Sequence, residues 1–330
     1  MGYGALVDRA HNTSPSIAFG RRATRRCAVA LAVGSLVACF GTPGSAAPDD
    51  FLRGTVTVPL TRIVFSGNRY VAEADLGLGK PVPLMIHGNA GMFLMVTHEI
   101  GEQVTGGPVP KLEDYGYSAK GKGRIRVPLL RFGERRLSDL RDVPVFDYLA
   151  DGGGPAQGMI GVPFLTGERA AVDFSRDVMV LGVKRSSSPD RKILKRGYRF
   201  VAFKLDAKGK ATIPAFFPAL GRTLSITPST VSNALTLHRP PFAGAVPMTR
   251  DTTDSDHSPS GTHPELFHAD LVAFEIAGVK LSSPASFEDF AEYANTPESE
   301  LSSFGLLGFD WMKEHAAIID YANGFLYFRP

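Results

Sequence analysis

The apolar residues of this chain occur in short runs that are rich in β-branched and aromatic side chains. Gly, Pro and charged pairs separate the runs, a pattern typical of antiparallel β-strands joined by tight turns. The chain contains 35 Gly and 24 Pro, which favours short strands over long helices. The pattern predicts strands over residues 55–60, 62–65, 70–76, 82–86, 93–96, 124–130, 170–174 and 178–183. Short helices are predicted at 97–104 and 228–235.

Two pairs of segments repeat along the chain. Residues 158–180 align without a gap with residues 305–327, at an offset of 147. Residues 69–97 align with residues 199–227, at an offset of 130. The matched positions of the first pair include Gly158 with Gly305, Gly161 with Gly308, Ala170 with Ala317 and Asp173 with Asp320. Both pairs keep their order, so the sequence predicts a duplicated all-β domain rather than a repeat array.

The N-terminus has the layout of an export signal. Arg21, Arg22, Arg25 and Arg26 precede an apolar run over residues 27–40, and the small and turn-forming residues GTPGSAAP follow. We expect residues 1–46 to act as a signal peptide or lipoprotein signal, and the protein to lie outside the cytoplasm. A membrane anchor is the alternative, but the run is short for a span.

Two processing routes are open for this leader. Cys39 ends a segment, LVAC, that resembles a bacterial lipobox and makes Cys39 a candidate for lipidation. The residues Gly44-Ser45-Ala46 resemble a signal-peptidase site instead. The chain has 2 cysteines, Cys27 and Cys39, so the body after the leader has no thiol for a disulfide, a metal site or a nucleophile.

Charge excludes one class of partner. Residues 1–46 carry a net charge of +4, which leaves 31 basic and 32 acidic residues in the rest of the chain. A near-neutral body gives no support to nucleic-acid binding. Residues 184–197, KRSSSPDRKILKRG, hold six bases against one acid and are expected to be a solvated linker between the two copies, with a basic docking strip as the alternative.

The repeated unit resembles the aspartic-protease superfamily in its two-lobed, pepsin-like form. Met159-Ile160-Gly161 and Leu306-Leu307-Gly308 resemble the hydrophobic-hydrophobic-Gly motif that closes each lobe, and Asp-containing strands follow both. Tyr115-Gly116-Tyr117 occupies a flap-like place. The resemblance implies an N-terminal lobe over 47–183, a linker over 184–197, a C-terminal lobe over 198–330 and a cleft between the lobes.

The family's catalytic Asp-Thr-Gly triplets are missing. His87, Gly88 and Asn89 stand at the first position, and the ungapped alignment puts Phe217, Pro218 and Ala219 at the second. The resemblance implies that both catalytic aspartates and both threonines that brace the two loops are lost. Because the reaction needs two carboxylates that share a proton, we expect no catalytic residue of the aspartic-protease type.

Three functions remain open. The first is a catalytically inactive protein that binds an extended peptide in the cleft, with His87, Tyr115, Tyr117, Phe216 and Phe217 as candidate binding residues. The alternative for Phe216 and Phe217 is that they fill the core between the two lobes. The second is a peptidase with a centre rebuilt around His87 and a carboxylate such as Asp147 or Asp151, and the third is a structural surface lipoprotein. We expect a monomer with no metal and no organic cofactor, which meets a membrane only through a lipid on Cys39.

Overall fold

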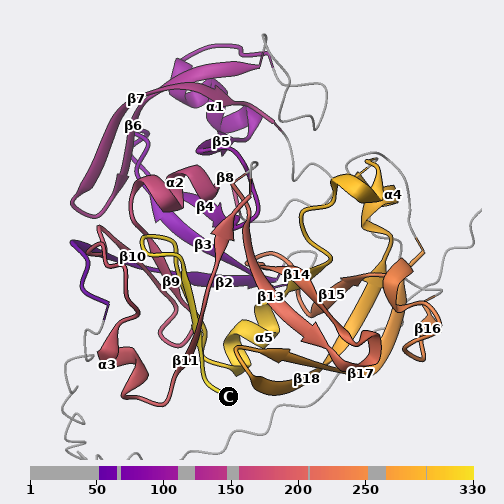
Figure 1. Cartoon of the computed structure of the whole chain (residues 1–330). Helices are drawn as coiled ribbons and strands as arrows, with labels where there is room; N and C mark the ends of the chain where they lie inside the picture. Colours follow the sequence, from indigo (N-terminus) through magenta and orange to yellow (C-terminus); the bar gives the residue numbers. More distant parts are fainter. Residues whose placement is uncertain are drawn as a thin grey trace, which may run out of the picture. The chain divides into compact units, whose positions relative to one another are not determined.

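The structure, a computed structural model, describes residues 52–64, 68–110, 123–146, 156–206, 209–251, 265–294 and 296–330. These residues belong to one unit that spans Asp49–Pro330. They are mostly β, as the hydrophobic pattern predicts (Figure 1).

The first half of the chain supplies ten strands and two helices among its described residues. They are β1 (Val56–Pro59), β2 (Thr61–Val64), β3 (Asn68–Ala74), β4 (Val82–Ile86), β5 (Leu94–Val96), α1 (His98–Thr105), β6 (Arg124–Phe132), β7 (Arg135–Pro144), β8 (Gly158–Ile160), α2 (Val162–Gly167), β9 (Ala171–Asp173) and β10 (Val178–Leu181). Each strand predicted in this half lies on one of them, and α1 lies within one residue of the helix predicted at 97–104.

The second half follows the short helix α3 (Arg191–Leu194). Its strands are β11 (Arg199–Ala202), β12 (Lys204–Leu205), β13 (Ala211–Phe217), β14 (Arg222–Pro228), β15 (Leu235–His238), β16 (Thr249–Arg250), β17 (Phe267–Ile276), β18 (Val279–Glu288), β19 (Gly305–Leu307), β20 (Ile318–Asp320) and β21 (Phe325–Phe328). Its helices are η1 (Pro218–Leu220), η2 (Pro240–Phe242), α4 (Phe290–Ala294), η3 (Glu298–Glu300) and α5 (Phe309–Glu314).

Both halves contribute equally to one six-stranded sheet. Its order is β1-β10-β9-β20-β21-β11, and β9 pairs with β20 antiparallel at the centre. The order reads the same from either edge if each first-half strand is exchanged for its second-half counterpart. The offset of 147 therefore holds in space, because β9, β10, α2 and β8 match β20, β21, α5 and β19 residue for residue.

The offset of 130 does not hold. It matched residues of β3 with residues of β11, but β11 pairs with β21 in the way that β1 pairs with β10. The counterpart of β3 is β13, which pairs with β14 as β3 pairs with β4. The turn between the paired strands has seven residues in the first half (75–81) and four in the second (218–221), so no ungapped alignment can match both strands.

The remaining described strands form two larger sheets and a hairpin. The first half builds β2-β3-β4-β8-β5, and the second half builds β12-β13-β14-β19-β15-β18-β17-β16. The hairpin β6–β7 forms a separate two-stranded sheet. The helix predicted at 228–235 is absent, because residue 228 ends β14, a loop follows, and β15 begins at Leu235.

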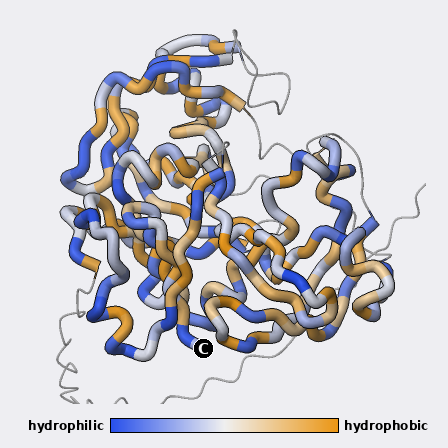
Figure 2. Tube along the Cα trace, viewed as in Figure 1, coloured by the Kyte–Doolittle hydropathy of each residue, from blue (hydrophilic) through white to orange (hydrophobic). Residues whose placement is uncertain are grey.

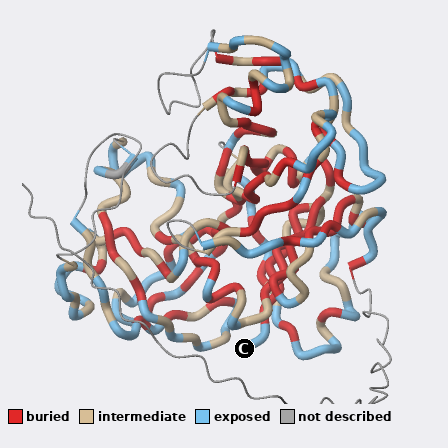
Figure 3. The backbone as a smooth tube through the Cα atoms, turned by 180° about the vertical axis from the view of Figure 1, so that it is seen from behind, coloured by how far each residue is buried: buried red, intermediate tan, exposed pale blue. Residues whose placement is uncertain are grey.

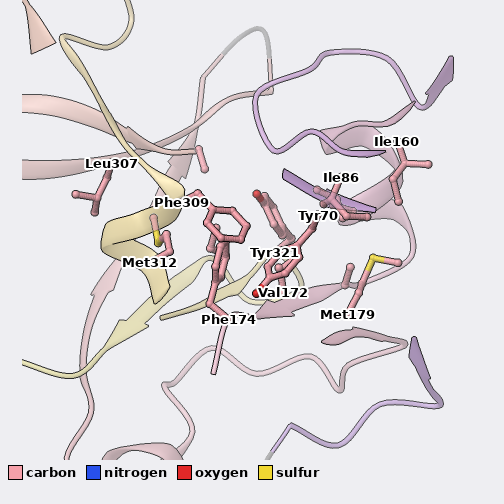
Figure 4. Packing of buried hydrophobic residues seen from close by; sticks show 14 of the residues in the cluster. Tyr70, Ile86, Ile160, Val172, Phe174, Met179, Leu307, Phe309, Met312 and Tyr321 are labelled. Carbon is pink, nitrogen blue, oxygen red and sulfur yellow. The ribbon is translucent and has the colours of Figure 1, made fainter. Parts of the chain in front are cut away.

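One hydrophobic core runs through both halves. Tyr70 of β3 packs edge-on against Phe309 of α5, with ring centroids 4.7 Å apart, and Phe174 lies 5.4 Å from Phe309. Figure 4 shows these rings together with Tyr321. The Tyr70 hydroxyl donates to Asp177, which also accepts from Lys313 Nζ at 2.6 Å. The two halves are thus joined by packing and by ion pairing, and Figure 3 shows the buried stretches gathered in the strands of the interior.

Candidate functional site

Two loops occupy equivalent places in the two halves. The first loop (residues 87–91) follows β4, which runs parallel to β8, and the His87 N–H donates to Ile160 O at 2.9 Å. The second loop (residues 229–233) follows β14, which runs parallel to β19, and the Ser229 N–H donates to Leu307 O at 2.9 Å. Since Ile160 and Leu307 are matched residues, His87 and Ser229 are equivalent positions.

This equivalence corrects the second triplet. Ser229, Thr230 and Val231 stand where the sequence placed Phe217, Pro218 and Ala219. The predicted residues instead end β13 and enter the turn η1. The error follows from the offset of 130, which matched β3 with β11 instead of with its counterpart β13.

Phe217 and Phe216 do not lie at either loop. Phe217 is fully buried in the second half, with its ring 5.1 Å from that of Phe242 and 6.0 Å from that of Phe274. Phe216 points the other way along β13, where it is 36% exposed and faces Glu275 of β17. Phe217 is therefore a core residue of its own half and does not fill a core between the two halves.

The closing glycines sit against the loops. A Cβ on Gly161 would lie 2.2 Å from Met92 O, and a Cβ on Gly308 would lie 2.2 Å from Ala234 O. The preceding residues, Met159-Ile160 and Leu306-Leu307, form the strands β8 and β19 that hold the loops. Only glycine permits this approach, which explains the hydrophobic-hydrophobic-Gly pattern in both halves.

Thr230 joins the two loops. Its buried hydroxyl accepts the Gly88 N–H at 2.9 Å and donates to Ile86 O at 2.7 Å. Both partners belong to the first half, so one side chain satisfies two backbone groups across the boundary. The sequence predicted that both bracing threonines are lost. The structure shows that one is kept, at Thr230.

The structure thus consists of two duplicated halves that share one sheet and are joined by the Thr230 brace between their loops. This arrangement resembles the two-lobed, pepsin-like form that the sequence predicts.

Comparison with known proteins finds similar solved structures but no similar sequence. No protein-family model and no curated protein sequence matches the chain. Solved structures that it resembles include basic 7S globulin from soybean, at a TM-score of 0.46 and 11% identity over 83% of this chain and 94% of that one. Conglutin gamma, a basic 7S globulin from lupine seeds, gives a TM-score of 0.45 and 11% identity, with the same coverage of both chains.

The first loop of this pepsin-like fold lacks the threonine side chain. A Cβ on Gly88 would lie 2.4 Å from the Tyr321 hydroxyl oxygen and 3.3 Å from Thr230 Cγ2. Tyr321 follows β20, is 4% exposed, and its hydroxyl has no hydrogen-bond partner among the described residues. Burial raises the pKa of Tyr321 above its ordinary range. The tyrosine hydroxyl thus fills the space that a side chain at residue 88 would need.

His87 is a neutral imidazole at physiological pH. Burial, together with the positive charges of Arg69 and Lys210, lowers its pKa from 6.5 to about 4. Its Nδ1 accepts the Asn89 N–H at 3.4 Å. The half-buried ring therefore carries a proton on Nε2 and has no carboxylate partner within the described residues.

Ser229 is held by its own loop. Its buried Oγ accepts from the backbone N–H groups of Val231 at 3.3 Å and Ser232 at 3.1 Å. The Asn89 amide lies 3.1 Å from this Oγ, and when its oxygen faces the hydroxyl its nitrogen donates to Gly88 O and Pro228 O. A hydroxyl that already serves as acceptor twice and donor once is positioned as a structural group, not as an activated nucleophile.

The loop positions equivalent to the catalytic aspartates of the resembled family hold His87 and Ser229, and neither side chain supplies a carboxylate for the aspartic-protease reaction. That reaction needs two carboxylates with separated pKa values on either side of one water. An imidazole and a serine hydroxyl stand in their places, and nothing in the geometry links them as base and nucleophile.

The two aspartates of the closing strands, Asp173 and Asp320, accept hydrogen bonds from the turns that follow them. Asp173 accepts from Ser175 and from Arg176 Nε at 2.7 Å. Asp320 accepts from the Ala322 and Asn323 N–H groups at 3.1 Å, and burial raises its pKa to about 6. Both cap tight turns after β9 and β20.

Several predicted positions fall outside the described residues. They are Cys39, Tyr115, Tyr117, Asp147 and Asp151. The lipidation site, the flap-like segment and the proposed partners of His87 therefore remain predictions. Within the described residues, no cluster of His, Cys, Asp and Glu could hold a metal ion. None of the described helices is long and apolar enough to cross a membrane.

Proposed function

We propose that this chain is an exported, catalytically inactive protein of pepsin-like fold that holds an extended peptide or protein segment in the cleft between its halves. One observation carries the proposal. The loop-to-loop brace through Thr230 is kept, while both carboxylate positions hold other residues, His87 and Ser229.

Retention of the brace supports a role for the loops that is independent of proton transfer. A hydroxyl with two buried partners across two halves keeps the loops at a fixed separation. A fixed pair of loops at the base of a cleft still presents backbone groups and side chains to an extended chain. Binding by strand addition requires only such groups and pockets for alternate side chains.

The half-buried residues of the loops supply the polar and apolar contacts of this site. His87 offers a neutral Nε2–H donor, and Asn89 offers its amide. Val231 is half-buried and packs against a cluster that contains Met85, Met92 and Met95. A ligand segment would meet a mixed surface, which suits a peptide better than a small charged metabolite.

The test is a peptide-library experiment on residues 47–330. The pH is varied from about 3 to about 7.5, so that the range spans the titration of His87. Bound peptides are identified by mass spectrometry after gel filtration, and new peptide ends report cleavage. The variants are His87→Ala and, as a matched control away from the loops, His315→Ala on the end of α5. A pepstatin-type inhibitor is included as a competitor.

We expect peptides to be retained without cleavage, with retention weakened in His87→Ala and unchanged in His315→Ala. Cleavage that disappears in His87→Ala would overturn the proposal and favour a rebuilt centre with a carboxylate such as Asp147 or Asp151. No retention and no cleavage would also overturn it, in favour of a structural surface lipoprotein.

A further inference from the structure

The segment between the two halves has an unusual charge. Residues 184–197 hold six basic residues and one acid, Asp190. In the structure their side chains are exposed except at a few positions, of which Ile193 is fully buried. Figure 2 shows the tube around α3, labelled in Figure 1, as mostly hydrophilic.

This segment is fixed to the body of the protein. The Asp190 carboxylate caps α3 by accepting the Lys192 N–H at 2.7 Å, and the Asp190 N–H donates to the Tyr327 hydroxyl at 2.9 Å. The Asn323 amide accepts from Ser186 N–H at 2.7 Å and donates to Lys184 O at 3.2 Å. The basic side chains are therefore displayed from a backbone anchored on the six-stranded sheet.

Five of the six basic residues of this segment lack an acidic partner among the described residues. Lys184, Arg185, Arg191, Lys192 and Lys195 make no ion pair with any residue that the structure describes. Exposed Arg53, Arg199 and Arg329 flank them. We call residues 184–199 together with Arg53 and Arg329 the basic face.

The β6–β7 hairpin provides the contrast within the same molecule. It is also rich in arginine, but four of its guanidinium groups are paired with acids of the protein. Arg131 contacts Asp75 at 2.5 Å, Arg141 contacts Asp139 at 3.0 Å, and Arg135 contacts Glu168. Cations left without acids cost self-repulsion, which an external anion would relieve.

The path of the chain favours a membrane as the source of that anion. Leu52, the first described residue, is buried in a small cluster with Val183, Ile193 and Tyr198, beneath the basic face. Cys39 lies 13 residues before Leu52. That length reaches at most about 45 Å when extended. A lipid on Cys39, or the apolar run before it, would hold this face within that distance of a bilayer.

We propose that the basic face binds the anionic headgroups of phospholipids. Groups of four to eight Lys and Arg beside a membrane attachment are recognised features of such binding, and a single lipid chain needs a second, electrostatic contribution for stable attachment. The proposal is independent of peptide binding in the cleft and of the loop residues. It orients the six-stranded sheet toward the membrane.

The test uses residues 47–330, without any lipid on Cys39, and sedimentation with vesicles. One vesicle contains phosphatidylcholine alone and the other contains added phosphatidylglycerol. The variant combines Lys184→Gln, Lys192→Gln and Lys195→Gln. The matched control combines Lys80→Gln, Lys204→Gln and Lys280→Gln, three exposed lysines elsewhere that give the same net charge. Thermal unfolding confirms that both triple variants are folded.

We expect binding to the anionic vesicles only, weakened by salt and reduced at least about tenfold in the basic-face variant. The control should stay within about twofold of the unaltered protein. Equal loss in both variants would show an effect of net charge alone and overturn the proposal. Absence of binding to anionic vesicles, or equal binding to both vesicles, would overturn it as well, as would binding to DNA or heparin without binding to vesicles.

Discussion

The two loops of the site share a backbone and differ in side chains. The first loop follows β4, which runs parallel to β8, and the second follows β14, which runs parallel to β19. The first N–H of each loop donates to the last carbonyl of that parallel strand, Ile160 O or Leu307 O. The first loop then carries His87 and Gly88, whereas the second carries Ser229 and Thr230. The contrast shows that one loop backbone can be kept while its side chains change.

The side chain that connects the two loops comes from the second loop. Thr230 reaches into the first half, but no side chain at Gly88 can reach back, because the Tyr321 hydroxyl occupies the space. The asymmetry has a direct consequence for stability. Changes at Thr230 should act on both loops, and changes at His87 on one.

The largest effect is expected from Thr230→Val. The variant keeps the shape of the side chain but leaves the buried Gly88 N–H and Ile86 O without partners. We expect a loss of about 2–4 kcal/mol in the free energy of unfolding, measured by urea denaturation. Thr230→Ser retains the hydroxyl and serves as the control, with a loss of about 1 kcal/mol or less. If the two variants were equally stable, the brace would contribute nothing.

A smaller effect is expected from Gly88→Ala. The added methyl would meet the Tyr321 hydroxyl at 2.4 Å, and we expect a loss of about 1–3 kcal/mol. Tyr321→Phe should restore most of that loss in the double variant, since it removes the obstructing oxygen. Alone, Tyr321→Phe should be close to neutral, because its hydroxyl lacks a partner among the described residues.

Gly107→Ala is the matched control, since no atom lies within 4 Å of a Cβ built there. Its unfolding free energy should stay within about 0.5 kcal/mol of the unaltered protein. Additive losses in the Gly88→Ala, Tyr321→Phe double variant would contradict the steric account.

The smallest effect is expected at His87, and it depends on pH. The folded-state pKa, about 4, lies below the ordinary value of 6.5, so the folded protein binds fewer protons than the unfolded chain between these values. Stability from this group is complete above pH 6.5 and is lost as the pH falls toward 4. His87→Gln should remove about 2 kcal/mol of this acid sensitivity.

Urea midpoints measured from pH 7.5 to 4 would show the difference as a flatter profile in the variant. Asp320 contributes with the opposite sign, since its pKa is raised to about 6 and its protonation favours the folded state. Its contribution is common to both proteins and cancels in the comparison. The exposed His268 is the control, and a profile flattened equally by His268→Gln would show that His87 is not responsible.

The sequence predicted the parts of the fold that repeat at constant length. β8 to β10 and β19 to β21 share the same spacing, so an ungapped alignment found them. It failed where residues of β3 were matched with β11 instead of β13, and this failure displaced the second triplet from Ser229 to Phe217. The helix predicted at 228–235 failed because Thr230 and Val231 form the loop that packs against the first half, a contact that local pattern does not encode.

The sequence predicted the first loop of the candidate site but not the second. His87 follows a continuous apolar strand and was found directly. Ser229 and Thr230 follow a strand that alternates, and their signal was the distance to Gly305-Leu306-Leu307-Gly308, which is five residues longer than the matching distance from His87 to Gly158. The role of Tyr321 was not accessible from sequence, since it depends on a contact between residues 233 positions apart.

The six-stranded sheet has a consequence for how the chain folds. β1 is among the first strands made and β21 is the last, yet β9 of the first half pairs with β20 of the second. Contacts of such long sequence separation slow folding, because the loop must close before the pairing stabilises it. In the first half, β9 lacks its second neighbouring strand until β20, residues 318–320, has been synthesised. Because β20 pairs with both β9 and β21, deletion of β20 should remove a neighbouring strand from each half of the sheet.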